Sequence, residues 1–324
     1  MGAQKSINSF CFITATYGAD KEHFALLRQS IACSKFKHIE HKCVVQSEDI
    51  AAFEQYNGWP MQCISSADLL PQSLELQRVK AACLARQCGP NLTKLLGSLA
   101  RRFYFPRWPH FTGWHTQQIS KLMLAASCQT DYAVIVDSDV LVTPNATLPE
   151  LEDRNNLVCF SHMVEQSAVQ GKVANWNRSA MDLFDTGNSE ESSIAEKYFD
   201  TPFILHVPTL NAMFKWLEAK YAMPWWQAML QQAPRRWSEF QCYRTFLRHH
   251  YHGDKQVVYK NPTTHKYLFD TIDSAQVVAC VDQWLDDPST HFITLHSHSA
   301  GRKNIKPNFI KGIVALFKKL PSSQ

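Results

Sequence analysis

Residues 133–139 read Ala-Val-Ile-Val-Asp-Ser-Asp, an apolar run that ends in two carboxylates one residue apart. The run predicts a buried strand, with Asp137 and Asp139 where it ends. Because side chains alternate along a strand, we expect both carboxylates to reach one cation while Ser138 faces elsewhere. Mg²⁺ and Mn²⁺ prefer oxygen ligands and commonly bridge carboxylates to phosphates, so the pair predicts a phosphate-bearing ligand. The same tripeptide is typical of a plain turn, and by itself it leaves both interpretations open.

A helical pattern precedes the apolar run. Residues 113–126 carry apolar side chains at helical spacing, and a short polar turn at residues 128–131 leads into the strand. Open α/β sheets bind their ligands at the carboxyl ends of strands delivered in this way. The context therefore favours the ligand-binding interpretation of the two carboxylates.

The start of the chain predicts a β-α-β unit. Residues 10–14 and 43–46 are short apolar strands, and residues 22–33 form a helix between them. The turn from Thr14 to Tyr17 then lies at a strand carboxyl end, where a nucleotide base can stack on Tyr17. Asp20 can accept hydrogen bonds from the base or the ribose. An ordinary turn aromatic is an equally good interpretation of Tyr17.

Length and composition are those of a globular protein. The 324 residues suffice for one large α/β domain, and the formal net charge of +4 requires no nucleic acid. Ten cysteines occur without a CxxC pair, which predicts reduced and mostly buried thiols. The polar residues after Met1 predict no secretory signal, and no apolar stretch approaches the length of a membrane span. We therefore expect a cytoplasmic protein.

The second half of the chain continues the alternation of strands and helices. Residues 157–160 and 201–208 predict short strands, and residues 210–222 predict a helix. Residues 166–193, rich in Ser, Asn and Asp, predict a loop that is either a mobile lid or a surface insertion. Ser238 and Glu239 are typical of a helix start, with the serine as N-cap and the acid in the first turn.

Two basic segments have two interpretations each. Residues 73–103 predict a helix interrupted at Gly89-Pro90, whose basic residues form either a solvated face or an acceptor-binding or lipid-facing surface. Residues 309–320 predict an amphipathic helix with interspersed lysines. It either packs on the core or lies peripherally on an anionic membrane surface.

Three motifs, in this order, resemble GT-A-fold, metal-dependent glycosyltransferases, and in particular a little-characterised bacterial family. They are Gly-Trp-x-x-Gln-Gln-x-x-Lys at residues 113–121, Asp-x-Asp at residues 137–139, and Ser-Glu-aromatic before a Tyr at residues 238–243. The resemblance covers about residues 8–305. It implies a single α/β domain over residues 1–324 with a Rossmann-like, mostly parallel sheet and a helical insertion. Its parts are a nucleotide-sugar-binding half (8–145), an acceptor and catalytic half (146–308) and a C-terminal amphipathic helix (309–324).

The resemblance implies transfer of a sugar from a nucleotide-diphosphate sugar to a hydroxyl acceptor, such as a bacterial surface glycan or glycolipid, with Mn²⁺ or Mg²⁺ as cofactor. Glu239 and Asp139 are the catalytic candidates, and Glu239 either binds sugar hydroxyls or deprotonates the acceptor. Both inversion and retention of the anomeric configuration stay open. The residues expected beside the nucleotide or diphosphate are Thr14, Tyr17, Asp20, Gln118, Lys121, Ser138, Gly301, Arg302 and Lys303.

A third metal ligand is implied near the C-terminus. In retaining GT-A enzymes such as glycogenin and the lipopolysaccharide galactosyltransferases, a late His joins the Asp-x-Asp pair, followed by a Gly three residues on and then a Lys-Pro. His298 and Gly301 fit that spacing after a predicted strand at residues 292–295, whereas Lys306-Pro307 comes two residues late. His296 shares a face with His298 if the strand continues, so either histidine can be the ligand.

Two other classes of protein remain as alternatives. A haloacid-dehalogenase-type phosphatase also has Asp-x-Asp after an apolar strand, but that fold normally begins with the motif. Its Gly-Asp-x-x-x-Asp motif is also absent, since Gly253-Asp254 is followed by Lys-Gln-Val-Val. The other alternative is a nucleotide-sugar-binding protein without catalysis.

Overall fold

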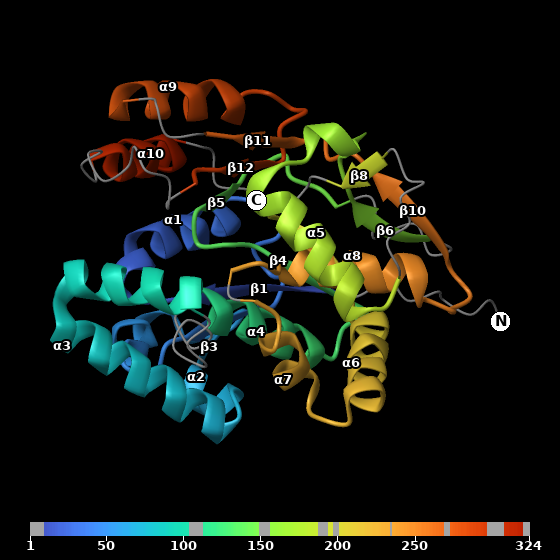
Figure 1. Cartoon of the computed structure of the whole chain (residues 1–324). Coiled ribbons are helices and arrows are strands. Elements are labelled where there is room, and N and C mark those ends of the chain that lie inside the picture. Colours follow the sequence, from blue (N-terminus) through green and yellow to red (C-terminus); the bar gives the residue numbers. More distant parts are fainter. Residues whose placement is uncertain are drawn as a thin grey trace.

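The computed structural model describes residues 10–103, 113–148, 156–186, 194–196, 201–233, 235–268, 273–296 and 308–319. Its centre is a five-stranded sheet with the order β3-β2-β1-β4-β9 (Figure 1). The first four strands run parallel, and β9 is antiparallel to β4. These strands are β1 (Phe10–Thr16), β2 (His41–Val45), β3 (Met61–Ser65), β4 (Tyr132–Ile135) and β9 (Phe203–His206). The predicted α/β class with a mostly parallel sheet is confirmed.

Helices cover both faces of this sheet, which is why its central strands are almost continuously apolar. On one face lies α1 (Lys21–Ala32), whose Arg28 guanidinium is 2.9 Å from Nδ1 of His41 on β2. On the other face lies α4 (Gly113–Ala126), which is followed by Cys128, and the Cys128 thiol is 2.8 Å from that of Cys11 on β1. Side chains of the sheet therefore contact a helical layer on each face.

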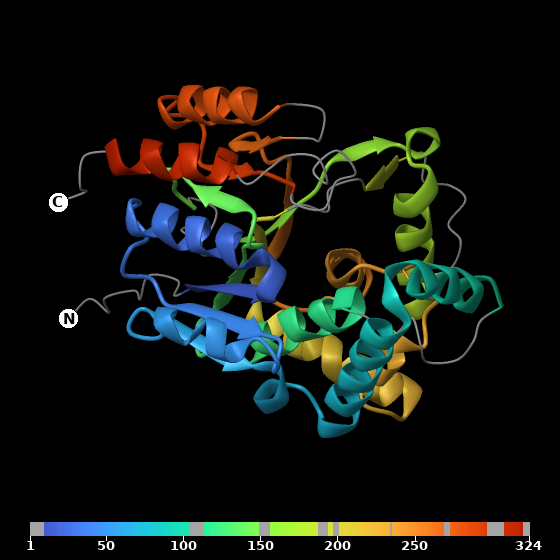
Figure 2. The ribbon, with the colours of Figure 1, turned by 90° about the vertical axis from the view of Figure 1, so that its left-hand side faces the viewer.

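A second layer adjoins α1. The strands β5 (Val140–Val142), β12 (Phe292–Thr294) and β11 (His265–Tyr267) form a small mixed sheet. The helices α9 (Ser274–Leu285) and α10 (Asn308–Lys319) stack with α1 beside it (Figure 2). Phe309, Ile313 and Phe317 of α10 are buried in this layer, while its lysines are exposed. The predicted C-terminal helix thus packs on the core with its apolar side.

Two further strand pairs and six helices complete the described chain. The strands β6 (Asn156–Phe160) and β10 (Gln256–Lys260) pair in parallel, and β7 (Met163–Glu165) and β8 (Ile194–Glu196) pair antiparallel. The helices are α2 (Ser66–Leu69), α3 (Gln72–Phe103), α5 (Gly171–Leu183), α6 (Val207–Tyr221), α7 (Trp225–Leu230) and α8 (Glu239–His249). In the part of the chain that these ranges cover, no helix is long and apolar enough to cross a membrane.

The prediction of a loop over residues 166–193 is wrong for residues 171–183, while residues 187–193 lie outside the described residues. Residues 171–183 form α5, which packs against α8. Val173, Trp176, Ala180 and Leu183 recur at helical spacing and carry the partly or fully buried side of this helix. The Ser, Asn and Asp residues between them are typical of loops, and they conceal this periodicity in the composition of the segment.

The interpretation of residues 73–103 as a solvated basic helix is wrong at Arg78. Its side chain is 3% exposed, and its guanidinium pairs with Glu75 at 2.7 Å and with Glu48 at 2.6 Å. Arg86, one of the other basic residues, does face solvent. The predicted interruption is present, because Gly89 has a φ of 71° inside α3. All ten cysteines are free thiols, five of them buried and Cys83 exposed.

Candidate functional site

The Asp-Ser-Asp segment is a turn whose carboxylates share one cavity. It connects β4 to β5, and the Val140 N–H donates to the Asp137 carbonyl at 3.0 Å. Asp137 and Asp139 nevertheless line the same cavity of about 150 Å³. The turn interpretation is confirmed, and cation binding stays a prediction. Strand alternation is not the reason why the two carboxylates share a cavity, because they lie in a turn and not in a strand. The Ser138 hydroxyl donates to that of Thr16 at 2.9 Å and ties this turn to the end of β1.

This cavity, which we call the acidic cavity, combines charged groups with aromatic rings. Its lining includes four carboxylates and one ammonium, which belong to Asp20, Asp137, Asp139, Glu239 and Lys121. The other lining residues are Trp114, Gln117, Gln118, Ser138, Trp176, Ser238 and Phe240. They come from segments far apart in the sequence, and they meet where β1 and β4 end. Parallel sheets place ligands at such carboxyl ends.

Lys121 lies between two of the carboxylates. Its ammonium is 2.6 Å from the Asp137 carboxylate and 3.3 Å from that of Glu239, and the Lys121 and Glu239 side chains are each 5% exposed. Burial alone lowers the pKa of a lysine, but here the charges of Asp137 and Glu239 outweigh burial and hold the pKa of Lys121 above its ordinary value. Lys121 is therefore a fixed positive charge in the wall of the acidic cavity.

Glu239 is held by α4 from two sides. As the first residue of α8 it has a backbone N–H without a partner inside its own helix. The Gln118 amide oxygen accepts this N–H at 3.1 Å, and Lys121, one turn further along α4, contacts the Glu239 carboxylate. Ser238 occupies the predicted N-cap position, but its hydroxyl makes no cap bond. Burial raises the pKa of Glu239 above its ordinary value, against the opposing charge of Lys121. A carboxylate with a raised pKa is suited to accept a proton near neutral pH.

The raised pKa of Glu239 predicts a dependence of stability on pH. Below the ordinary value of 4.5 the carboxyl is protonated in both folded and unfolded chains, and its contribution is fully present. As the pH rises from there through the raised folded-state pKa, that contribution is lost. Glu239→Gln binds no proton, so its free energy of unfolding relative to wild type is expected to increase over this range. Urea unfolding at a series of pH values measures the difference, and a difference that stays constant with pH contradicts the prediction.

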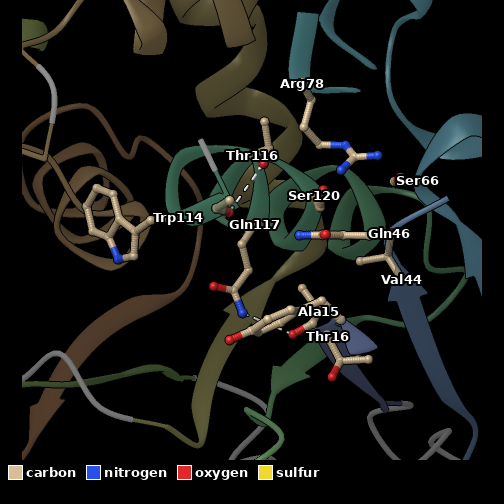
Figure 3. Close-up of a pocket in the computed structure, with 12 residues that line it drawn as sticks. Ala15, Thr16, Val44, Gln46, Ser66, Arg78, Trp114, Thr116, Gln117 and Ser120 are labelled. Atoms are coloured by element: carbon tan, nitrogen blue, oxygen red, sulfur yellow. Dashed lines mark hydrogen bonds between the residues drawn. The ribbon is translucent and has the colours of Figure 1, made fainter. Parts of the chain in front are cut away.

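A second cavity of about 360 Å³ adjoins the first, and we call it the larger cavity. The two share Trp114 and Gln117. Figure 3 shows Gln117 reaching from α4 to β1, where its amide donates to the Ala15 carbonyl at 3.0 Å. The lining residues are Ala15, Thr16, Tyr17, Val44, Gln46, Ser66, Arg78, Gly113, Trp114, Thr116, Gln117 and Ser120. The larger cavity thus lies at the carboxyl ends of β1 and β2 and combines rings and aliphatic groups with amides.

Arg78 lies in the wall of the larger cavity with its charge already matched (Figure 3). Besides Glu75 and Glu48, it contacts the Ser47 hydroxyl at 3.0 Å. The hydrogen bond from the Arg78 guanidinium lowers the pKa of Glu48 to about 2, so the Glu48 carboxylate stays charged beside Arg78. Because two carboxylates neutralise Arg78, this wall offers hydrogen bonds rather than net positive charge to a ligand.

Most of the described residues predicted for ligand binding lie in one cavity or the other. Tyr17 lines the larger cavity, whereas Asp20, Gln118, Lys121 and Ser138 line the acidic cavity. Thr14 is the exception. It is fully buried and its hydroxyl donates to the Val136 carbonyl at 2.6 Å, so the side chain does not reach either cavity.

The predicted residues near the C-terminus are only partly described. His298, Gly301, Arg302 and Lys303 lie outside the described residues. His296 is described, with a φ of 45° and its ring centroid 5.9 Å from that of Tyr267. The Leu295 N–H donates to the Asp139 carbonyl at 2.8 Å, so β12 leads past the Asp-Ser-Asp turn.

Sequence reasoning missed several lining residues. Trp176 was missed because its segment was interpreted as a loop, and Gln117 was passed over although it belongs to the quoted motif. Gln46 and Thr16 follow the ends of β2 and β1 and could have been found by asking which residues follow each strand.

The side chains of the acidic cavity can be compared with the ligands that a divalent cation prefers. Two carboxylates from one turn open into it, and the Asp137 side chain is 34% exposed, so an oxygen-ligated Mg²⁺ or Mn²⁺ fits their chemistry. Within the described ranges, no set of three or more His, Cys, Asp or Glu side chains is arranged to hold a metal ion. A cation held by Asp137 and Asp139 would therefore need further oxygen or nitrogen ligands from elsewhere.

Comparison with known proteins gives one family and one structural likeness. Residues 8–292 match a family of unknown function, DUF6492, and the chain belongs to this family. No curated protein matches the chain. Among solved structures, the galactosyltransferase LgtC in complex with donor and acceptor sugar analogs is similar, with 11% sequence identity, 95% of each chain covered and a TM-score of 0.42.

Proposed function

We propose that this member of DUF6492 is a cation-dependent glycosyltransferase that moves a sugar from a nucleotide-diphosphate sugar to a hydroxyl acceptor. One observation carries the proposal: two adjoining cavities at the carboxyl ends of parallel strands, one with the volume of a ligand pocket and the other ringed by carboxylates. A nucleotide sugar has the matching parts, because a flat base and ribose are joined through a diphosphate to a polyhydroxylated ring.

The larger cavity suits the nucleoside. Tyr17 and Trp114 offer aromatic faces for a base, and Gln46 and Gln117 offer amides for its hydrogen-bonding edge. Since Arg78 is neutralised by its own carboxylates, the nucleoside rather than the diphosphate belongs in this cavity.

The acidic cavity suits the diphosphate and the sugar only if a cation accompanies them. A diphosphate that enters beside four carboxylates and one ammonium meets net repulsion. We assign Asp137 and Asp139 as ligands of Mn²⁺ or Mg²⁺, with His298 as the further ligand. When bound, the cation supplies Lewis-acid stabilisation of the charge that develops on the departing nucleoside diphosphate. Arg302 and Lys303 are proposed to contact the same diphosphate.

Two different groups can accept the proton of the acceptor hydroxyl, and both are compatible with the position of Glu239. In both, the acceptor oxygen forms a bond to the anomeric carbon and the bond to the nucleoside diphosphate breaks. With inversion, the Glu239 carboxylate accepts the acceptor's proton, a role for which its raised pKa is suited. With retention, the leaving phosphate takes that proton and Glu239 binds sugar hydroxyls. In either case Gln118 and Lys121 fix the position of Glu239.

The test is a thermal-shift panel of UDP, GDP and CDP and their sugars, each with and without Mn²⁺. One nucleoside together with the cation is expected to raise Tm, because a ligand that binds only the folded chain stabilises it by mass action. Hydrolysis or transfer of the matching nucleotide sugar then establishes turnover. Stabilisation by nucleotide with no dependence on the cation and no turnover contradicts the proposal and favours a binding protein. Release of inorganic phosphate from phosphomonoesters favours the phosphatase.

A further inference from the structure

Two indole rings from different helices form one wall of the acidic cavity. Trp114 is the second residue of α4 and Trp176 lies in the middle of α5, and both side chains are half-buried. Their ring planes are within 14° of parallel, and the ring centroids are 6.1 Å apart. Both residues line the acidic cavity. The acidic cavity therefore has two stacked aromatic rings beside its carboxylates.

Arg235 bonds the ring of Trp176 directly and bonds His115, the sequence neighbour of Trp114. The Arg235 N–H donates to the His115 imidazole at 2.8 Å, and His115 neighbours Trp114 on α4. The Arg235 carbonyl accepts from the indole N–H of Trp176 at 3.3 Å. Arg235 has a φ of 59°, an unusual backbone conformation for a residue with a side chain. Such conformations persist where the surrounding structure determines them, and they are frequent at ligand sites.

A buried tryptophan supports the wall from behind. Trp237 is fully buried, and its ring centroid is 6.1 Å from that of Trp114. The Lys172 ammonium lies 5.0 Å from the Trp176 ring centroid and 5.9 Å from that of Trp114. Lys172 is an exposed residue at the start of α5, so its side chain can move aside for a ligand. The rings are rigid, whereas the group that lies over them is adaptable.

We infer that this indole wall binds the pyranose ring of a sugar acceptor, an inference that rests on the proposed function. The C–H face of a pyranose carries slight positive charge and packs on the negative face of an aromatic ring. The hydroxyls at its edge need hydrogen-bond acceptors, and the carboxylates of Asp20 and Glu239 line the same cavity. Aromatic faces beside carboxylates suit a carbohydrate better than a lipid hydroxyl or a peptide side chain.

The position of Trp176 favours the acceptor over the donor sugar. Trp114 lines both cavities, while Trp176 lines the acidic cavity. A donor is anchored by its nucleoside in the larger cavity and by its diphosphate at Asp137 and Asp139. Trp176 belongs to a helix that packs on α8, the helix that begins with Glu239. It therefore lies where a second sugar would meet the proposed base.

The experiment measures sugar binding directly, with the full chain saturated by the nucleoside diphosphate that stabilises it and by Mg²⁺, which is diamagnetic and leaves the NMR signals of the sugar unbroadened. The probes are the methyl glycosides of glucose, galactose, mannose and N-acetylglucosamine. Saturation-transfer NMR detects the binding of each one. At least one glycoside is expected to bind wild type through its ring C–H groups. Trp176→Ala is expected to weaken that binding about tenfold or more, and Trp176→Phe by less, because a ring remains. Trp284→Ala, which removes a half-buried indole on α9, is the matched control and is expected to bind as wild type does.

The outcomes separate the inference from the proposed function. If nucleotide and Mn²⁺ stabilise the chain but no glycoside binds, or if Trp176→Ala binds the glycoside as tightly as wild type, the indole wall is not an acceptor site although the transferase assignment stands. If Trp176→Ala weakens binding of the nucleotide sugar relative to the nucleoside diphosphate and leaves glycoside binding unchanged, the wall holds the donor sugar and the inference is wrong. If no nucleotide stabilises wild type, the proposed function itself fails.

Discussion

Asp139→Asn is expected to reduce cation-dependent turnover of the nucleotide sugar by about a thousandfold, because several kcal/mol of charge stabilisation are lost with the cation. Asparagine keeps the size of the side chain but not its charge. We choose Asp139 over Asp137 because the Asp137 carboxylate also pairs with Lys121, so that its replacement would disturb this ion pair as well. Donor hydrolysis measures turnover without knowledge of the acceptor. The rise in Tm that Mn²⁺ adds to nucleotide binding should disappear as well.

The control for Asp139→Asn is Asp282→Asn, which makes the same change at an exposed position of α9. It is expected to leave turnover and Mn²⁺ dependence unchanged. Full activity of Asp139→Asn with the same Mn²⁺ requirement as wild type would refute the assignment of the cation ligands. Equal losses in both variants would show that the effect comes from general charge and not from the acidic cavity.

Lys121→Met is expected to lower the free energy of unfolding by about 3–5 kcal/mol, the usual result when one partner of a buried ion pair is removed. The Glu239 carboxylate, 5% exposed, then loses the ammonium that offsets its burial, and Asp137 loses the same partner. Urea unfolding at neutral pH measures the loss. Activity is expected to fall too, because Lys121 helps to orient Glu239.

A double variant tests the origin of that loss. Lys121→Met combined with Glu239→Gln removes both buried charges, so it is expected to recover part of the stability that Lys121→Met alone loses. Lys215→Met, at an exposed position of α6, is the control and is expected to stay within about 0.5 kcal/mol of wild type. A Lys121→Met protein as stable as wild type would mean that these three side chains do not depend on one another.

The sequence predicts the elements of the first half of the chain well because their signals are local. The strand at residues 10–14, the helix at 22–33 and the helix at 113–126 all have clear periodicity, and the structure has β1, α1 and α4 there. The helix α5 was missed because its polar residues, typical of loops, outnumber the four that repeat at helical spacing. The Asp-Ser-Asp turn was found from its carboxylates, yet only the fold brings both into one cavity.

The partners of charged residues could not be predicted. Arg78 was interpreted as part of a solvated face, but Glu48 follows the end of β2 and meets it only in the folded chain. Lys121 was assigned to a diphosphate from the motif around it, while its pairing with Asp137 and Glu239 joins three segments far apart in sequence. Thr14 is predicted to lie near a ligand because the predicted strand ends there, but β1 continues to Thr16 and the Thr14 side chain is fully buried. Pairing across the fold is tertiary information, which local pattern does not carry.

The excess of carboxylates around Lys121 and Asp139 has a thermodynamic consequence. Such a cavity attracts a cation and repels an anion, so each ion improves the affinity of the other when both are bound. Linkage requires the two improvements to be equal, whichever ion arrives first. Under the proposed function, occupancy by a nucleotide would follow the free concentration of the cation. A chain deprived of divalent ions would then bind its nucleotide sugar more weakly without any change of shape.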